Sequence, residues 1–211
     1  MKSTPRTQAN RREDTRARIL AAAGRLFAQK GFDGARVDGI AAAAKVNKQR
    51  LYHYFGNKDG LFTAVLERSY RGIREAEARL ELDDLPANQA IMQLVEFTWG
   101  YYIAHPEFIR LLNSENQLEA RHLKSSPATR EINAGHIARM QGLIARGGKE
   151  GTVRRDIDAL NLSINVVALS YFYLMNRHTL STVFEQDLGS QKRLKARLRV
   201  VKDNIARWIA P

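Results

Sequence analysis

Residues 46–62 read VNKQRLYHYFGNKDGLF, and this stretch decides how the rest of the chain is interpreted. Basic, amide and aromatic side chains share one short predicted helix, Lys48 to Tyr54. Asn47 before this helix and Asn57 before the next can each accept a hydrogen bond from the free amides of a first helical turn. A short capped helix with such a surface is what reading DNA requires.

The side chains of this short helix divide between two faces at about 100° per residue. Leu51, Tyr54 and Phe55 share one face, which anchors the helix to its own domain. The opposite face carries Gln49 and His53, flanked by Arg50 and Tyr52. Glutamine suits the exposed edge of adenine, arginine suits guanine, and a tyrosine hydroxyl or lysine ammonium suits phosphate. An ordinary helical hairpin with a solvated polar face has the same spacing, so the spacing alone leaves both interpretations open.

Composition narrows the class of protein. The chain has 211 residues, no cysteine and a net charge of +12, so disulfides and thiolate metal sites are excluded. Residues 1–70 hold 14 lysines and arginines against 6 carboxylates, which concentrates the attraction for a polyanion in the N-terminal third. No run approaches 18 apolar residues, so we expect no membrane-spanning segment.

The hydrophobic pattern has helical periodicity and no alternating strand pattern of useful length. It predicts an all-α chain of about nine helices, in which Gly31 ends the first helix in the left-handed conformation. We expect a disordered basic arm over 1–12, a helix-turn-helix domain over 13–60 and a larger helical domain over 61–211. The predicted helices are 14–30, 37–44, 48–54, 58–82, 86–105, 107–120, 128–146, 158–179 and 190–209.

Residues 15–62 resemble the N-terminal domain of the TetR family of bacterial transcriptional regulators. The resemblance is carried by Thr-Arg-Ala-Arg-Ile-Leu at 15–20, Leu-Phe at 26–27, Gly-Phe at 31–32, Ile-Ala at 40–41, Leu-Tyr-His-Tyr-Phe at 51–55, Asn-Lys at 57–58 and Leu-Phe at 61–62. It implies a homodimeric repressor that binds a palindromic operator, with half-sites about 34–36 Å apart, and is released by a small-molecule effector.

The resemblance also implies which residues meet DNA. Tyr54 and Lys58 are expected on phosphates, and Gln49, Arg50, Tyr52 and His53 at or near base edges. Apart from the resemblance, the positive charges of Arg36 and Lys48 make them further candidates for DNA contacts. Two positions depart from the family pattern. Arg36 stands where the second helix usually has a serine or threonine cap, and Lys45 stands where the family usually has glycine, so Lys45 is expected at positive φ.

Two further sites are expected in the C-terminal part. The family's two last long helices pack as an intermolecular bundle, and the candidate dimer residues are Leu160, Ile164, Val167, Tyr171, Leu194, Leu198, Val201, Ile205 and Trp208. Polar and aromatic residues on otherwise apolar faces are candidates for an effector pocket: Trp99, Tyr102, Asn113, Asn116, His136, Met140, Asn165, Phe172 and Asn176. This mixture suits an apolar or aromatic effector with one or two polar groups.

No enzymatic constellation is recognisable, because the five histidines show no close metal-ligand pairing and no serine lies in a nucleophile elbow. We therefore expect a cytoplasmic regulator that is not an enzyme, with no metal and no cofactor. Two alternatives stay open. One is a regulator of the same fold that activates transcription or answers to a protein partner. The other is an architectural protein that binds DNA without sequence preference.

Overall fold

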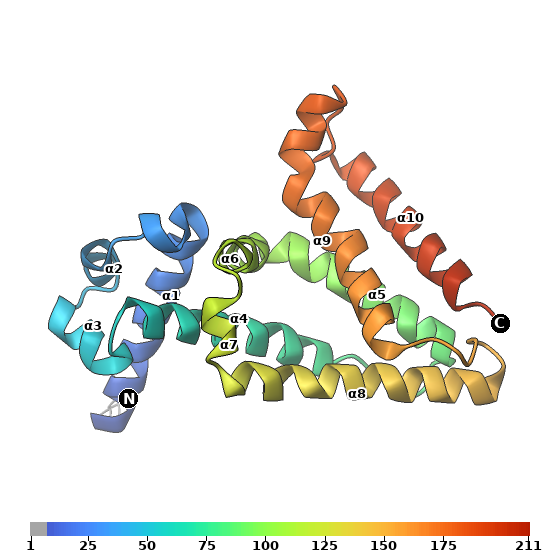
Figure 1. The fold of residues 1–211 in the computed structure, drawn as a ribbon, viewed down its shortest axis with the longest axis horizontal. Coiled ribbons are helices and arrows are strands. Elements are labelled where there is room, and N and C mark those ends of the chain that lie inside the picture. The colour runs from blue at the N-terminus through green and yellow to red at the C-terminus, as the bar shows by residue number, and fades with distance from the viewer. Residues whose placement is uncertain (1–7) are drawn as a thin grey trace, which may run out of the picture. The chain divides into compact units, whose positions relative to one another are not determined.

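The computed structural model describes residues 8–211, which form helices and no strands, so the all-α prediction is confirmed (Figure 1). The described residues contain ten helices, of which the short α7 had no sequence signal. The bounds are α1 Gln8–Gly34, α2 Val37–Ala43, α3 Lys48–Phe55, α4 Lys58–Ala78, α5 Ala87–Ala104, α6 Pro106–Gln117, α7 Arg121–Lys124, α8 Pro127–Glu150, α9 Ala159–Val183 and α10 Gln191–Ile209.

The predicted disordered arm is wrong for residues 8–12, because α1 already begins at Gln8. Residues 1–7 of that arm lie outside the described residues. Once the later turns of α1 are formed, each residue added at its N-terminus gains one more backbone hydrogen bond. The residue types in this segment, Gln, Ala and Arg, are also good helix formers. Polarity alone therefore does not indicate disorder here.

The chain divides into two compact units, and neither is one continuous segment. The first runs to Ser69 and includes Arg110–Thr129, which contain the second half of α6 and all of α7. The second consists of Tyr70–Ile109 and Arg130–Pro211. Helices α4, α6 and α8 therefore each contribute to both units.

Aromatic rings hold the core of the first unit. Phe27, Phe32 and Phe62 are buried, and the ring of Phe62 lies 4.8 Å from that of Phe27 and 5.2 Å from that of Phe32. Gly31 has the predicted positive φ, 69°, but its ψ of 179° is not left-handed, and α1 continues past this kink to Gly34 instead of ending there. Phe32 follows the kink and is buried in the core. The amide of Phe32 then donates a hydrogen bond to the hydroxyl of Ser114, on α6, at 3.2 Å.

The two departures around α2 take the predicted local geometry. Arg36 is the N-cap residue of α2 and makes no side-chain capping hydrogen bond. Lys45 has φ 52°, the left-handed conformation that the usual glycine would adopt freely. The amide of Val46 still donates to the carbonyl of Ala41 at 3.0 Å, so the turn between α2 and α3 keeps a closing hydrogen bond.

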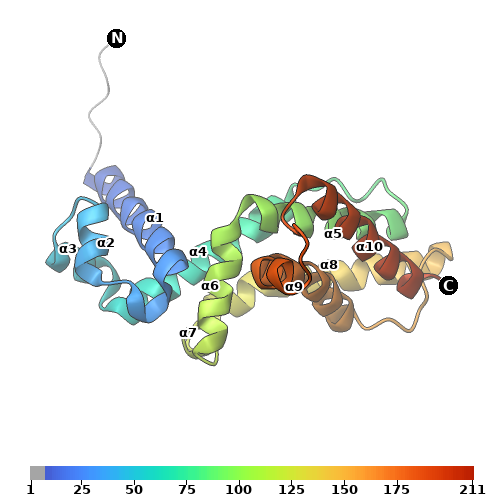
Figure 2. The same ribbon diagram turned by 90° about the horizontal axis from the view of Figure 1, so that it is seen from above.

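In the second unit, helices α5, α9 and α10 pack against one another, with α9 and α10 as an antiparallel pair (Figures 1 and 2). Helix α8 was predicted to end at residue 146, but it continues through the glycines at 147 and 148 as far as Glu150. The chain then turns at Gly151, with φ 71°. Gly147 lies inside α8, and only glycine fits there, because a Cβ would stand 2.4 Å from a methyl carbon of Val153. That glycine is needed for close packing rather than for a turn.

Helix α9 is long and apolar enough to cross a membrane by length and composition, with a mean hydropathy of 1.2 over its best window. Only 33% of that window is buried in the subunit. Polar residues are scattered along this helix, so it contains no long uninterrupted apolar run. A helix with one apolar face on its own core and another available to a second subunit has the same composition.

Candidate DNA-binding surface and effector site

The recognition surface on α3 has the two faces that its sequence predicts. Leu51 is completely buried, and Tyr54 and Phe55 pack against the core of the first unit. Gln49, Arg50 and His53 are exposed, and Tyr52 is 37% exposed. The Asn47 side chain accepts a hydrogen bond from the Arg50 amide at 2.7 Å, which confirms the predicted cap. Helix α3 thus presents amide, guanidinium and imidazole groups outward on a fixed backbone.

Basic side chains surround this surface at positions set by neighbouring groups. The Lys58 ammonium donates to the carbonyl of Asp33 at 3.2 Å and lies 4.7 Å from the centre of the Phe32 ring. Lys48 forms an exposed ion pair with Asp38 at 3.2 Å, and Arg36 is exposed. Exposed pairs contribute little energy, so Lys48 can exchange Asp38 for a phosphate at small cost.

A buried polar cluster joins α6 and α7 to α4 within the first unit. Glu115 is 1% exposed and accepts hydrogen bonds from the amides of His122 and Leu123, at 2.7 and 2.9 Å. Its other oxygen lies 2.7 Å from Nδ1 of His122. The second nitrogen of that ring faces Asp59, on the first turn of α4, at 3.2 Å. The rings of Phe32 and Phe62 each lie 4.8 Å from the imidazole.

A second polar cluster lies inside the second unit, around Glu77 of α4. The carboxylate pairs with Arg74 and lies 2.9 Å from Nδ1 of His136 on α8, and Arg139 donates to the Glu77 carbonyl at 2.9 Å. Burial raises the pKa of Glu77, but the His136 hydrogen bond and the charges of Arg74, His136 and Arg139 outweigh it. The net result is a pKa below the ordinary 4.5.

The lowered pKa of Glu77 predicts an acid-sensitive contribution to stability. Ionised Glu77 stabilises the fold above its ordinary pKa of 4.5, and this contribution is lost as pH falls through the lower folded-state value. We expect Glu77→Gln to lower the free energy of unfolding by about 1–3 kcal/mol at pH 7 and by less below pH 4. Urea unfolding of both proteins across this pH range measures the difference, and a pH-independent difference would contradict the assignment.

The predicted pocket residues fall in different environments. Trp99, Tyr102 and Met140 are buried in the second unit, and burial raises the pKa of the Tyr102 hydroxyl. His136 is bound to Glu77, and Asn165 is half-buried. Of the remaining four, Asn113 and Asn116 belong to the first unit, Phe172 is 59% exposed, and the Asn176 amide donates to the Phe172 carbonyl.

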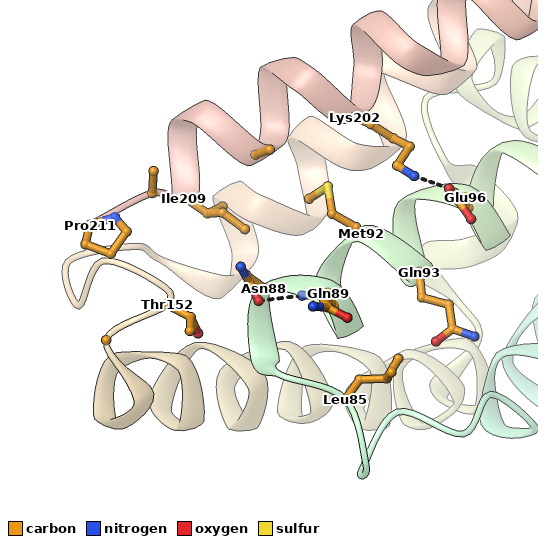
Figure 3. Close-up of a pocket in the computed structure, with 13 residues that line it drawn as sticks. Leu85, Asn88, Gln89, Met92, Gln93, Glu96, Thr152, Lys202, Ile209 and Pro211 are labelled. Atoms are coloured by element: carbon orange, nitrogen blue, oxygen red, sulfur yellow. Dashed lines mark hydrogen bonds and ion pairs between the residues drawn. The ribbon is translucent and has the colours of Figure 1, made fainter.

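A cavity of about 780 Å³ lies elsewhere in the second unit, between the start of α5, the end of α10 and the turn after α8 (Figure 3). Its lining has three amides, an ion pair between Lys202 and Glu96, and apolar groups. Lining residues include Leu85, Asn88, Gln89, Met92, Gln93, Thr152 and Ile209. None of the nine predicted pocket residues lines this cavity.

The outer face of α9 carries large apolar side chains. Leu160, Ile164 and Phe172 are 55%, 51% and 59% exposed, and the helix also exposes the polar residues Asn161, His178 and Thr179. Of the other candidate dimer residues, Val167, Tyr171, Leu194, Leu198 and Trp208 are half-buried. Val201 and Ile205 are at most 1% exposed, on a helix that packs against α5, so they are removed from the candidate interface. Val200 beside them is 47% exposed and was not predicted.

Comparison with known proteins decides the family. A profile described as "Bacterial regulatory proteins, tetR family" matches residues 19–65, and one described as "Tetracyclin repressor-like, C-terminal domain" matches residues 88–205. The chain belongs to the TetR family. A TetR relative from Pseudomonas putida, the HTH-type transcriptional repressor NicS, is 37% identical over 185 residues, covering 88% of this chain and 87% of that protein.

Two TetR-like solved structures share the fold. A putative transcriptional regulator, SCO4942, from Streptomyces coelicolor superposes with a TM-score of 0.71 at 22% identity, over 92% of this chain and 98% of that one. A putative transcriptional regulator from Saccharomonospora viridis, in complex with choline, also gives 0.71, at 20% identity over 94% and 99% of the two chains. These structures support the fold, and the family profile over residues 19–65 with the repressor relative makes this TetR chain a DNA-binding transcriptional regulator.

Proposed function

We propose that this TetR protein is a cytoplasmic repressor that binds a palindromic operator as a homodimer and is released by a small-molecule effector. The observation that carries the proposal is the exposed row of Gln49, Arg50 and His53 on a helix anchored by the buried Leu51. Side chains of these types on a fixed helix suit base edges in the major groove. The repressor named among its relatives supports the direction of regulation.

The proposal is tested by selecting the preferred sequence from a random DNA library and then measuring affinity for it by fluorescence anisotropy. Selection of a palindrome that the protein binds at least about a thousandfold more tightly than unrelated DNA supports a specific regulator. Equal affinity for unrelated duplexes would instead favour the architectural alternative. A reporter gene placed behind the selected sequence separates repression from activation.

We expect Gln49→Ala and Arg50→Ala each to weaken binding to the selected operator. A base contact contributes about 1–3 kcal/mol of discrimination, and each substitution removes two such contacts because the dimer has two identical subunits. The expected loss is therefore about thirtyfold or more for each variant. Arg25→Ala, which removes an exposed charge elsewhere on α1, is the matched control and should change affinity only slightly. A uniform loss on all sequences would remove these residues from base recognition.

The cavity beside Met92 is the candidate effector site. Its volume of about 780 Å³ falls within the range of small-molecule pockets, and its amides can orient polar groups on an apolar ligand. Thermal unfolding in the presence of a panel of small aromatic and aliphatic compounds identifies a stabilising ligand. Met92→Trp should narrow the cavity and weaken that stabilisation while operator binding persists. Stabilisation that survives the substitution unchanged would place the ligand elsewhere, for example beside Tyr102 and His136.

A further inference from the structure

A positively charged cleft of about 390 Å³ lies between the first turns of α1 and the recognition helix. Its lining comes from Gln8, Arg11 and Arg12 on α1 and from Arg50, His53 and Tyr54 on α3. Three guanidinium groups thus share one depression with an imidazole and a phenol hydroxyl. All of these polar groups can donate hydrogen bonds to the same small anion.

The cleft brings three guanidinium groups together, and none of them is ion-paired to a carboxylate of the described residues. Within residues 8–211, no carboxylate lies at ion-pair distance from Arg11, Arg12 or Arg50. Some exposed arginines elsewhere are paired, such as Arg121 with Asp59 at 2.7 Å and Arg154 with Asp156 at 2.5 Å, whereas the cleft gathers three guanidinium groups in one depression. Gathering unpaired like charge costs free energy in the isolated protein, and a bound anion removes that cost.

The first turns of α1 contribute nothing to the core that would explain them. Every residue from Gln8 to Asp14 is exposed, and the first buried residue of the helix is Thr15. The family profile for the DNA-binding domain begins only at Ile19. The first turns of α1 are therefore a solvent-exposed surface, on the side where α3 carries Arg50 and His53.

We propose that Arg11 and Arg12 bind one backbone phosphate of the operator, next to the base pairs that α3 reads. The proposal rests on the DNA-binding function and adds an interaction outside the recognition helix. Arg50 and His53 share both the cleft and the outward face of α3, so an anion in the cleft lies beside the major-groove contacts. Paired guanidiniums hold a phosphate oxygen by charge-assisted hydrogen bonds, which fix the position of the protein along the duplex without reading its sequence.

The test compares the salt dependence of operator binding for the wild type and for Arg11→Ala/Arg12→Ala. Removing one neutralised phosphate per subunit should reduce the slope of log affinity against log salt by about 1.8 per dimer. If the affinities converge near 1 M salt, this corresponds to about sixtyfold weaker binding near 0.1 M. The same reduction is expected on unrelated DNA, because a phosphate carries no sequence information.

Arg25→Ala/Arg79→Ala is the matched control, since it removes two exposed positive charges that do not line the cleft. Its slope should fall by much less than that of the cleft variant. A second measurement replaces single operator phosphates by neutral methylphosphonates. One position in each half-site should weaken wild-type binding and leave Arg11→Ala/Arg12→Ala unaffected.

The other outcomes distinguish this proposal from the proposed function. Equal slopes for the cleft variant and the control would overturn the phosphate interaction while sequence-specific binding by the wild type still stands. A changed sequence preference with an unchanged slope would also overturn it, since the arginines would then read bases. Absence of specific binding by the wild type would instead refute the proposed function itself.

Discussion

Replacing Glu115 by alanine is expected to lower the free energy of unfolding by about 3–5 kcal/mol, because each buried donor left without an acceptor costs about 1–3 kcal/mol. The substitution removes the acceptor of two buried amides, those of His122 and Leu123, and the partner of the His122 ring. His122 is only 2% exposed, so water cannot replace the missing carboxylate. Chemical unfolding at fixed protein concentration measures the loss, because dimerisation would otherwise shift the midpoint.

Asp59→Ala is the matched control for this prediction, since it removes a carboxylate that faces the same imidazole from the other side. Asp59 is 53% exposed, so its loss should cost about 1 kcal/mol or less. Glu115→Gln keeps an oxygen that can accept from the two amides and should fall between these variants. Equal effects for Glu115→Ala and Asp59→Ala would show that burial does not decide the strength of this cluster.

The sequence identified the local chemistry of the helix-turn-helix well, because that chemistry depends on neighbouring residues. The caps at Asn47 and Asn57, the positive φ of Gly31 and Lys45, and the inward face of Leu51 all follow from side-chain type and helical spacing. These features are set within one or two helical turns, so their prediction required no knowledge of distant contacts.

The long-range contacts could not be predicted in the same way. Glu115 lies on α6 and His122 on the short α7. Nothing in the spacing of these polar residues indicated that they are buried together in the unit that contains α1 to α3. The apolar residues of α10, from Leu194 to Trp208, similarly gave no sign of whether they pack within the subunit or against a second subunit. Val201 and Ile205 fit an intermolecular stripe as well as an intramolecular one, and only the packing on α5 separates the two.

The cavity illustrates the same difficulty. The pocket predicted from sequence draws on rings and amides in helical faces, whereas the cavity is bounded by a turn and by the end of the chain, including Thr152 and Pro211. Residues of this kind have no periodic pattern that could connect them. Their proximity follows from tertiary contacts such as the hydrogen bond from the Arg154 amide to the Ile209 carbonyl, at 2.9 Å.

Introducing arginine on the outer face of α9 is expected to dissociate the proposed homodimer. Ile164 and Phe172 are more than half exposed in the subunit and lie on the outer face of the helix. In a two-fold interface through this face, each substitution would place an unpaired charge in apolar surroundings twice. A buried charge without a partner costs about 3–5 kcal/mol, so Ile164→Arg alone should weaken dimerisation at least about a hundredfold.

Sedimentation velocity over a range of concentrations measures this dissociation, with Ala138→Arg as the matched control, because Ala138 is an exposed small residue on α8. The monomer formed by Ile164→Arg should keep its helical circular dichroism, since the replaced side chain does not belong to the subunit core. The monomer should bind one half-site through its single DNA-binding domain, and it should lose the extra affinity that a dimer gains by binding both half-sites. A dimer that persists in Ile164→Arg and in Phe172→Arg would place the interface on another face, and the apolar surface of α9 would then need a different partner.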